Sequence, residues 1–85
     1  MAAYKIFFRK SVWKDLKKIP DKDLKKILEC IEALGVNPRR PGSKKLSHQE
    51  RYRFRQGSYR IIYSIQDAEL TVWIIKVGHR KNVYL

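Results

Sequence analysis

The stretch RYRFRQGSYRIIYSIQ, residues 51–66, constrains the fold most strongly. On each side of Gly57-Ser58, apolar or aromatic side chains largely alternate with polar ones, at the period of a β-strand that has one buried face. Gly57 suits the positive φ that a type II′ turn requires in a two-residue hairpin loop. The stretch therefore predicts an antiparallel hairpin whose strands span 51–56 and 59–66.

The predicted hairpin places like charges opposite each other. Arg55 pairs with Arg60, and Arg53, which faces Ile62, emerges on the same face. The other face carries the side chains expected to point toward the core: Tyr52, Phe54, Tyr59, Ile61 and Tyr63. Opposed like charges cost from a few tenths to about 1 kcal/mol, and no acid in either strand offsets them. Guanidinium groups match phosphate oxygens, so this face favours a phosphate backbone over three merely solvated arginines.

Lysine and arginine outnumber the acidic residues by 20 to 8, which gives a formal net charge of +12. Hydrophobic residues make up 44% of the chain, enough for a folded core rather than a disordered basic tail. The charge exceeds what solubility requires and favours a polyanionic partner. Nucleic acid is the first expectation, an anionic membrane the second, and an acidic protein, compatible with nucleic acid, the third. No stretch has the pattern of a transmembrane helix or signal peptide, so no membrane partner is expected.

Cysteine and histidine usage bounds the metal chemistry and the compartment. Cys30 is the single cysteine, and with two histidines it gives no zinc-ligand spacing. Its place in an apolar helical pattern predicts a buried structural role. We expect no cofactor and no metal. Because neither an export signal nor a disulfide framework is evident, we expect a cytoplasmic protein.

The residues before the hairpin predict one strand and two helices. The strand spans 4–8. The first helix spans about 12–18, with Ser11 as its N-cap, and the second is capped by Asp21 and ended by Gly35. The apolar side chains at helical spacing, expected in the core, are Trp13, Leu16 and Ile19 in the first helix and Leu24, Ile27, Leu28, Ile31 and Leu34 in the second.

A basic loop and a further strand complete the predicted order. Residues 36–50 contain proline, glycine and basic residues and indicate a long irregular loop, which in a compact domain is often functional. The last strand spans 70–77, and Gly78 ends it. We therefore expect one α+β domain, residues 1–85, with the order β-α-α-β-β-β. In this fold a two-helix hairpin packs on one face of a mainly antiparallel four-stranded sheet.

Further residues are candidates for contacting RNA. Trp73 has the strand parity of the arginine face, near Ile62, where it either stacks on an unpaired base or packs under the C-terminal tail. The tail brings Arg80, as a fourth guanidinium, to the same edge, and it keeps the phenol of Tyr84 close to the hairpin. The candidate RNA-binding residues are Lys44, Lys45, Arg51, Trp73, His79 and Lys81.

Together these segments resemble the RelE/ParE superfamily of small toxins from bacterial and archaeal toxin–antitoxin pairs. The resemblance covers nearly the whole chain: the strand at 4–8, KKL at 44–46, YRFRQGSYRIIYSI at 52–65 and, most sharply, VGHRKNVY at 77–84. It implies a RelE-like fold and, for RelE-type members, an mRNA endonuclease that acts in the ribosomal decoding site, beside 16S rRNA. RNA carries its own nucleophile, the 2′-hydroxyl, so such a reaction needs orientation and charge stabilisation but no metal.

The resemblance also implies roles for five catalytic residues. Arg53 and Arg55 match basic strand residues that hold phosphates and support proton transfer. Arg60 matches an arginine that stabilises the scissile phosphate. Arg80 matches an arginine near the leaving 5′-oxygen, and Tyr84 matches a tyrosine that stacks on a base or helps to activate the 2′-hydroxyl.

The identity of a general base stays open at this point. Relatives often carry lysine at the positions of Arg53 and Arg55, and arginine stays charged, which argues against proton abstraction by either residue. His79 has a near-neutral reference pKa, but its place in the chain is also typical of an exposed loop histidine. His48, in the basic loop, is a weaker candidate.

Three alternatives remain. ParE-type relatives poison DNA gyrase and cut no RNA, although they share the fold and much of YRIIY and GHR. The chain is otherwise a catalytically inactive RNA-binding relative or an inactive toxin remnant. Every toxin interpretation implies a cognate acidic antitoxin that covers the basic face in a toxin–antitoxin hetero-oligomer.

Overall fold

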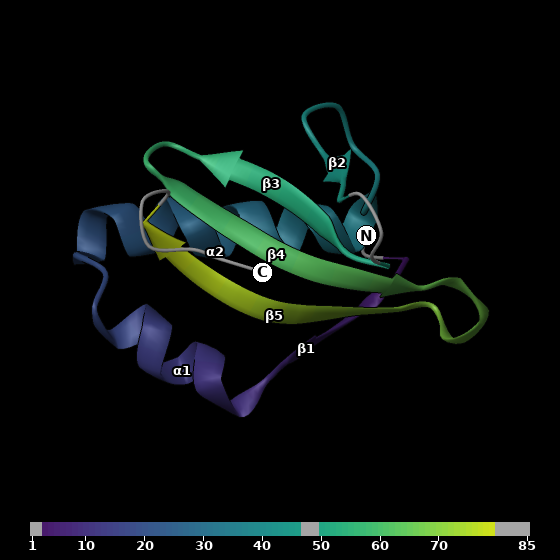
Figure 1. The fold of residues 1–85 in the computed structure, drawn as a ribbon, viewed down its shortest axis with the longest axis horizontal. Helices are drawn as coiled ribbons and strands as arrows, with labels where there is room; N and C mark the ends of the chain where they lie inside the picture. The colour runs from purple at the N-terminus through teal and green to yellow at the C-terminus, as the bar shows by residue number, and fades with distance from the viewer. Residues whose placement is uncertain (1–2, 47–49, 80–85) are drawn as a thin grey trace.

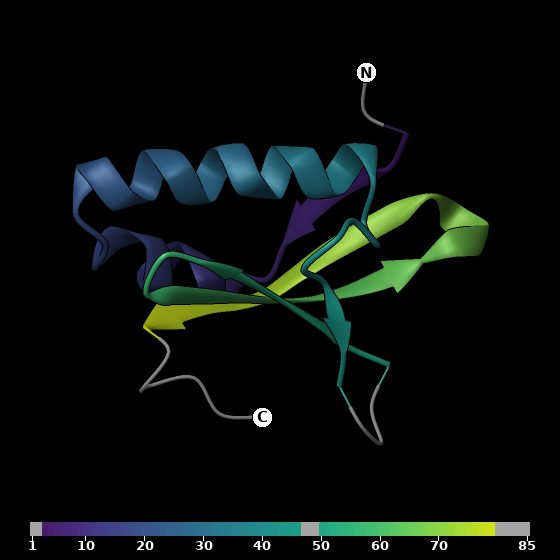
Figure 2. The same cartoon turned by 90° about the horizontal axis from the view of Figure 1, so that it is seen from above.

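The computed structural model describes residues 3–46 and 50–79. A five-stranded sheet, in the order β1-β5-β4-β3-β2, carries α2 across one face (Figures 1 and 2). We call the other face of the sheet the outer face. The elements are β1 (Lys5–Phe8), α1 (Lys10–Lys17), α2 (Asp21–Val36), β2 (Lys44–Lys45), β3 (Tyr52–Gln56), β4 (Tyr59–Gln66), a 3₁₀ turn (Asp67–Glu69) and β5 (Thr71–His79).

The α+β class and the mainly antiparallel sheet are confirmed, but the expected number of four strands is wrong. β1 pairs with β5 in parallel, and the other neighbours are antiparallel. The additional strand is β2, whose two residues lie inside the stretch expected to be wholly irregular and pair with Tyr52 and Arg53. A two-residue strand is too short to show alternation, so the surrounding proline and glycine signals dominated the prediction.

The hairpin prediction is confirmed residue by residue. Gln56 pairs with Tyr59 and Arg55 with Arg60. Gly57 has a φ of 60°, and Ser58 does not share its positive φ, as a type II′ turn requires. The five side chains expected to face the core do pack against it: Tyr52, Phe54, Tyr59, Ile61 and Tyr63.

The core lies between α2, α1 and the helix-facing side of the sheet. The two helices and the turn between them contribute Val12, Leu16, Ile19, Ile27, Cys30, Ile31 and Leu34. Cys30 is buried as expected, and burial raises the pKa of its thiol. Two core expectations are wrong. Leu28 is exposed, and Trp13 is 51% exposed and packs on Phe8, with ring centroids 4.8 Å apart.

The first helix differs from the prediction because it begins two residues earlier. α1 starts at Lys10 behind Arg9, rather than behind Ser11. Val12 and Leu16 then form the i, i+4 pair that enters the core, with Ile19 just beyond the helix, and Trp13 falls beside this pair. Two apolar neighbours in sequence made the stripe ambiguous, and the smaller side chain is the buried one.

Both glycines expected to end elements lie inside them. α2 continues through Gly35 to Val36, and β5 continues through Gly78 to His79. A close approach explains why a glycine suits position 35: a Cβ there would lie 3.1 Å from Cδ1 of Ile6 in β1. Within the described ranges, neither helix is long and apolar enough to cross a membrane.

Side-chain contacts hold the basic loop after α2 against the sheet. The buried Tyr63 hydroxyl donates to the carbonyl oxygen of Pro38 at 2.6 Å. The guanidinium of Arg40 lies over the Phe54 ring, 5.0 Å from its centroid. These contacts give this part of the loop a defined path along the sheet, which leads into β2.

Candidate functional site

The hairpin of β3 and β4 builds a compact group of cations, which we call the arginine cluster: Arg53, Arg55 and Arg60. Arg55 and Arg60 are directly opposite each other in the ladder, and Arg53 is two residues along β3 from Arg55. Because their neighbours Phe54 and Ile61 pack into the core, all three belong to the outer face. The observed register therefore brings the three arginines together on one face, as predicted.

The electrostatics of the arginine cluster favour an anion. Burial lowers the pKa of Arg53, and repulsion from Arg55 and Arg60 lowers it further. Within the part of the chain that the structure describes, the Nε of Arg60 is buried and has no hydrogen-bond partner. A buried donor without a partner costs about 1–3 kcal/mol, which an anionic acceptor would offset. The three arginines also have no ion pair with any described carboxylate.

Three further residues complete the surroundings of the arginine cluster. Lys44 in β2 pairs with Arg53, so it adds a fourth cation to the same face. Gly78 in β5 pairs with Arg60 and has no side chain to crowd the guanidinium. Lys76 in β5 pairs with Ile62, on the side opposite to Arg53. Ile62 is 1% exposed, which fits cover by the aliphatic stems of these two neighbours.

The other predicted RNA-contacting residues in the loop are not all part of this group. Lys45 pairs with Tyr52, whose side chain packs into the core, and its Nζ lies 3.6 Å from the Glu50 carboxylate. Arg51 precedes β3, and its carbonyl oxygen accepts the N–H of Leu46 at 2.8 Å. The structure thus brings Lys44 to the arginine cluster but directs Lys45 away from it.

Trp73 lies on the outer face, as its parity predicted, but not at the expected place. The expected neighbour Ile62 pairs with Lys76, and the β-bulge that follows, between Ile62 and Tyr63, sets the register of the pairs that include Trp73. Trp73 instead pairs with Ser64 and stacks on Phe7, with ring centroids 5.1 Å apart. It is separated along the sheet from the arginine cluster.

Several predicted site residues lie outside the described residues: Arg80, Lys81, Tyr84 and His48. His79 is the last described residue of this end. It pairs with Tyr59, and the two rings meet edge to face with centroids 5.8 Å apart. The roles expected for the four undescribed residues stay predictions.

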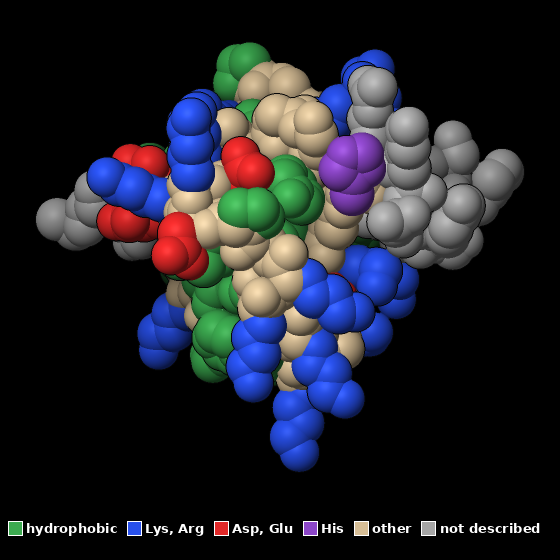
Figure 3. All heavy atoms as spheres, turned by 90° about the vertical axis from the view of Figure 1, so that its left-hand side faces the viewer, with side chains coloured by type: hydrophobic (Ala, Val, Ile, Leu, Met, Phe, Trp, Pro, Cys, Tyr) green, Lys and Arg blue, Asp and Glu red, His purple; other side chains and the backbone are tan. Residues whose placement is uncertain are grey.

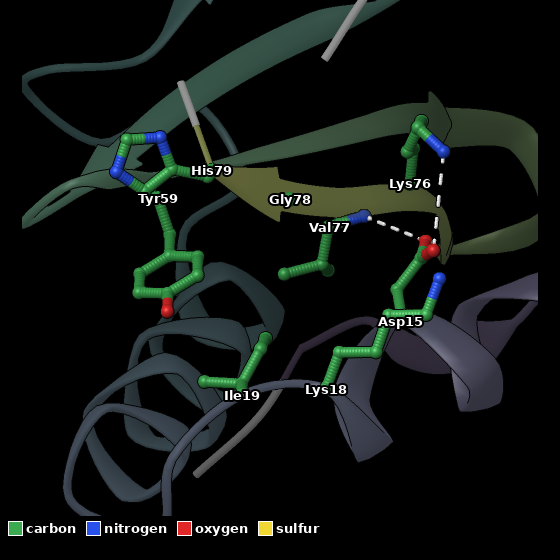
Figure 4. A pocket seen from close by; sticks show the side chains of 8 residues that line it. All are labelled: Asp15, Lys18, Ile19, Tyr59, Lys76, Val77, Gly78 and His79. Carbon is green, nitrogen blue, oxygen red and sulfur yellow. Dashed lines mark hydrogen bonds and ion pairs between the residues drawn. The ribbon is translucent and has the colours of Figure 1, made fainter. Parts of the chain in front are cut away.

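A pocket of about 290 Å³ lies where α1 meets β5, and His79 and Tyr59 line one end of it (Figure 4). β1 pairs only with the first half of β5, up to Ile74, so the second half has a free edge. Asp15 of α1 provides a hydrogen-bond acceptor for this edge, because its Oδ2 accepts the backbone N–H of Val77 at 3.2 Å. Its Oδ1 lies 3.9 Å from Nζ of Lys76 (Figure 4).

No local pattern predicts this role of Asp15, because a single acid among the lysines of a short helix does not indicate a nearby strand edge. Charge is unevenly spread around this end of the molecule: Figure 3 shows most acidic side chains on one side, with basic ones among them, and mainly basic ones elsewhere. Among the residues described, no group of three or more His, Cys, Asp or Glu side chains is placed to hold a metal ion.

Comparison with known proteins gives a consistent family. The model for the ParE toxin of the type II toxin–antitoxin system parDE matches residues 6–84. The chain is 34% identical over 84 residues to the toxin RelG of Mycobacterium tuberculosis, covering 95% of each chain. It is also 34% identical over 85 residues to the RelE1 protein of Methanocaldococcus jannaschii, covering 95% of this chain and 94% of that one.

A solved structure has the same fold over almost its whole length. The toxin–antitoxin complex RelBE2 of Mycobacterium tuberculosis contains a chain that is 32% identical to this one, with a TM-score of 0.83, and the match covers 92% of this chain and 99% of that one. The extent of these matches, on a fold built around the arginine hairpin, shows that the chain belongs to the RelE/ParE superfamily and is a toxin of a type II toxin–antitoxin system.

Proposed function

We propose that this toxin is a RelE-type endoribonuclease that cleaves mRNA in the ribosomal decoding site. The observation that carries the proposal is the arginine cluster, in which three guanidinium groups share one face and a buried Arg60 Nε has no described partner. A phosphodiester supplies the acceptors that this arrangement favours. The names of two relatives, RelG and RelE1, agree with the RelE branch of the superfamily.

The proposed reaction uses the 2′-hydroxyl of the RNA as nucleophile. Its oxygen forms a bond to phosphorus and its proton is removed, while the bond from phosphorus to the 5′-oxygen breaks and that oxygen gains a proton. The products are a 2′,3′-cyclic phosphate and a 5′-hydroxyl end. Negative charge gathers on the phosphorus oxygens in the transition state, and preorganised donors at that point account for a large part of catalysis.

Each arginine has a role in this scheme. Arg60 stabilises the scissile phosphate, since its partly buried guanidinium has donor capacity to spare. Arg53 and Arg55 hold the phosphate and support proton transfer without themselves acting as base, because a guanidinium remains charged even when its pKa is lowered. Arg80 stabilises the negative charge that develops on the leaving 5′-oxygen, and Tyr84 stacks on a base or assists the 2′-hydroxyl. The ribosome contributes the alignment of the strand.

We propose further that an acidic antitoxin covers the arginine cluster in a hetero-oligomer. A chain with a net charge of +12 and a cluster of cations that pair with no described carboxylate favours an acidic partner. The RelBE2 structure is itself a toxin–antitoxin complex. Carboxylates of the partner would compete with RNA phosphates for the same guanidinium groups, so binding of one would exclude the other.

The test is primer extension on mRNA in a cell-free translation system that receives the purified chain alone. The expected result is new 5′ ends within codons that appear only when ribosomes are present. A double variant, Arg80→Ala with Tyr84→Phe, is run beside it and is expected to produce none. Intact mRNA with continued translation would contradict the proposal. New ends that persist with the double variant would contradict only the roles of these two residues.

One observation favours a second candidate, inhibition of DNA gyrase. The family description that matches residues 6–84 is that of the ParE toxin. This candidate predicts loss of supercoiling activity when the chain is added to purified gyrase, with no effect on mRNA. The same preparation of protein serves both assays, so the two candidates are separated directly.

A further inference from the structure

Two large aromatic side chains lie on the outer face without a structural task in the core. Phe7 is 43% exposed and Trp73 is 38% exposed, and neither belongs to the core cluster. They are partners in the parallel ladder between β1 and β5, and their rings stack with an interplanar angle of 28°. Adjacent exposed apolar side chains are more informative about binding than single ones scattered over a surface.

The side of Trp73 away from Phe7 faces a small residue. In the antiparallel ladder with β4, Trp73 pairs with Ser64, whose short side chain cannot cover an indole. A hollow of about 350 Å³ opens at this point. Its lining residues are Arg9, Ser64, Gln66, Trp73 and Ile75. We call it the Trp73 hollow.

The chemistry of the Trp73 hollow fits a nucleotide. The indole offers a flat face for stacking on a base, which every base can use. Ser64 and Gln66 offer both donors and acceptors to the edge of a base, and Arg9 offers a cation to its phosphate. None of these lining residues carries a carboxylate. An acidic peptide would use Arg9 but would have no comparable use for an uncovered indole beside an amide and a hydroxyl.

The Trp73 hollow lies on the same strand as part of the arginine cluster. Ser64 and Arg60 are four residues apart along β4, and side chains at even spacing share a face. At about 3.3 Å per residue the separation is about 13 Å, a few nucleotides of one extended RNA strand. A strand with a phosphate at the arginine cluster can therefore reach the Trp73 hollow without leaving the sheet.

We propose that the Trp73 hollow binds one unpaired base of a single-stranded RNA, stacked on the free side of Trp73 with its phosphate held by Arg9. The choice of RNA as ligand rests on the proposed function. This site is separate from the cleavage chemistry, so it determines which stretch of RNA is held, and in what register, rather than the rate of bond breaking.

Tryptophan fluorescence tests the proposal, because the chain has two tryptophans that can be separated. Trp13→Phe leaves Trp73 as the only reporter, and Trp73→Phe leaves Trp13. Each variant is titrated with a single-stranded 2′-O-methyl oligonucleotide, which cannot be cleaved, and with the same backbone lacking bases. We expect saturable quenching of the Trp13→Phe variant by the oligonucleotide with bases only, and no quenching of the Trp73→Phe variant. Equal quenching by the abasic strand, or by polyglutamate, would overturn the proposal.

Filling the hollow provides a second test that keeps Trp73 in place. In the Trp13→Phe background, Ser64→Leu is expected to weaken binding of the oligonucleotide about tenfold, by excluding the stacked base. Ser64→Ala, which removes the hydroxyl but leaves the hollow open, is the matched control and is expected to bind at most about twofold more weakly than its parent. Thermal unfolding of both variants checks that each is folded. Equal affinity of the two variants would overturn the proposal.

The outcomes separate this proposal from the proposed function. If the wild-type chain cleaves mRNA on ribosomes but the Trp13→Phe variant shows no base-dependent quenching, only the Trp73 hollow is refuted. If quenching depends on bases but mRNA stays intact, the hollow is supported and the endoribonuclease activity is refuted.

Discussion

Two groups of arginines in this chain have opposite surroundings. Arg39, in the loop after α2, donates two hydrogen bonds to Asp67, at 3.0 and 2.8 Å, and lies 5.6 Å from the centroid of the Tyr52 ring. Its neighbour Arg40 covers the Phe54 ring. The arginine cluster, by contrast, has one guanidinium opposite another and a buried Arg60 Nε without a described partner.

The difference separates a structural role from a binding role. The contacts of Arg39 raise its pKa, whereas burial and like charges lower that of Arg53. A cation with its own partners contributes to folding, while an unpartnered cluster is electrostatically unfavourable until an anion arrives. The number of basic residues does not show which arginines stabilise the fold and which bind an anion, whereas the contacts of each guanidinium do.

Substituting alanine for one arginine of each group is expected to give the largest effects. Arg60→Ala should lower ribosome-dependent mRNA cleavage about 100-fold or more, because it removes donors at the point where charge develops. Its thermal stability should stay level or rise, since a like-charge pair and a buried unpaired donor are lost. Both are measured on the same preparation, by primer extension and by thermal unfolding.

Arg39→Ala is the matched control and should show the reverse pattern. It removes a bidentate contact with Asp67 and leaves the arginine cluster intact, so it should retain cleavage and unfold at a lower temperature. Loss of cleavage in Arg39→Ala with wild-type activity in Arg60→Ala would reverse the assignment of the two groups.

The anchoring of the basic loop predicts the next effect. Tyr63→Phe removes the hydroxyl that donates to Pro38 and leaves a buried carbonyl oxygen without this donor. The free energy of unfolding should fall by about 1–3 kcal/mol, as measured by urea denaturation. Tyr59→Phe, at a partly exposed tyrosine, should change it by less than about 0.5 kcal/mol. Equal losses would show that the Pro38 contact contributes nothing particular.

The arginine cluster was predictable because it depends on local register alone. One glycine turn fixes the hairpin, and alternation then places Arg53, Arg55 and Arg60 on one face. Lys44 and Gly78 reach the same place through pairings that no two-residue turn fixes, β2 with β3, and β5 with β4 beside a register shift. No local pattern encodes those pairings, which explains why Lys44 was named as a candidate but not placed beside Arg53, and why the open position beside Arg60 was missed.

The errors in the fold have the same origin. Gly35 favours the end of a helix by its own propensity, but tight packing against Ile6 of β1 gives it a place inside α2. The contact between Asp15 and the free edge of β5 could not be predicted from local sequence, because that edge exists only where β1 has ended. Tertiary contacts decided both positions.

The paired arginine also predicts a pH dependence of stability. Hydrogen bonds from Arg39, and then from Tyr4, lower the pKa of Asp67 from its ordinary value of 3.8 to about 2. A lowered carboxyl pKa stabilises the fold above the unfolded value, and this contribution disappears as the pH falls from about 4 through about 2. Urea unfolding at pH 2, 3, 5 and 7 should show a smaller difference between pH 2 and pH 5 for Asp67→Asn than for the wild type. Arg39→Ala should reduce the difference in the same direction, and identical pH profiles for all three chains would rule out the contact as its source.

The smallest effect compares two adjacent lysines on opposite sides of β2. Lys44 pairs with Arg53 on the face of the arginine cluster, whereas Lys45 pairs with Tyr52 and lies near Glu50. If Lys44 contacts an RNA phosphate, Lys44→Ala should weaken binding of an uncleavable 2′-O-methyl strand a few-fold. It should also reduce the slope of log affinity against log salt concentration by about 0.7, the value for one phosphate contact with a single strand. Lys45→Ala removes the same formal charge one residue away, so it should leave the slope nearly unchanged. Equal slopes for the two variants would mean that only net charge matters, and that the side of β2 on which a cation lies has no influence on how this toxin holds its polyanion.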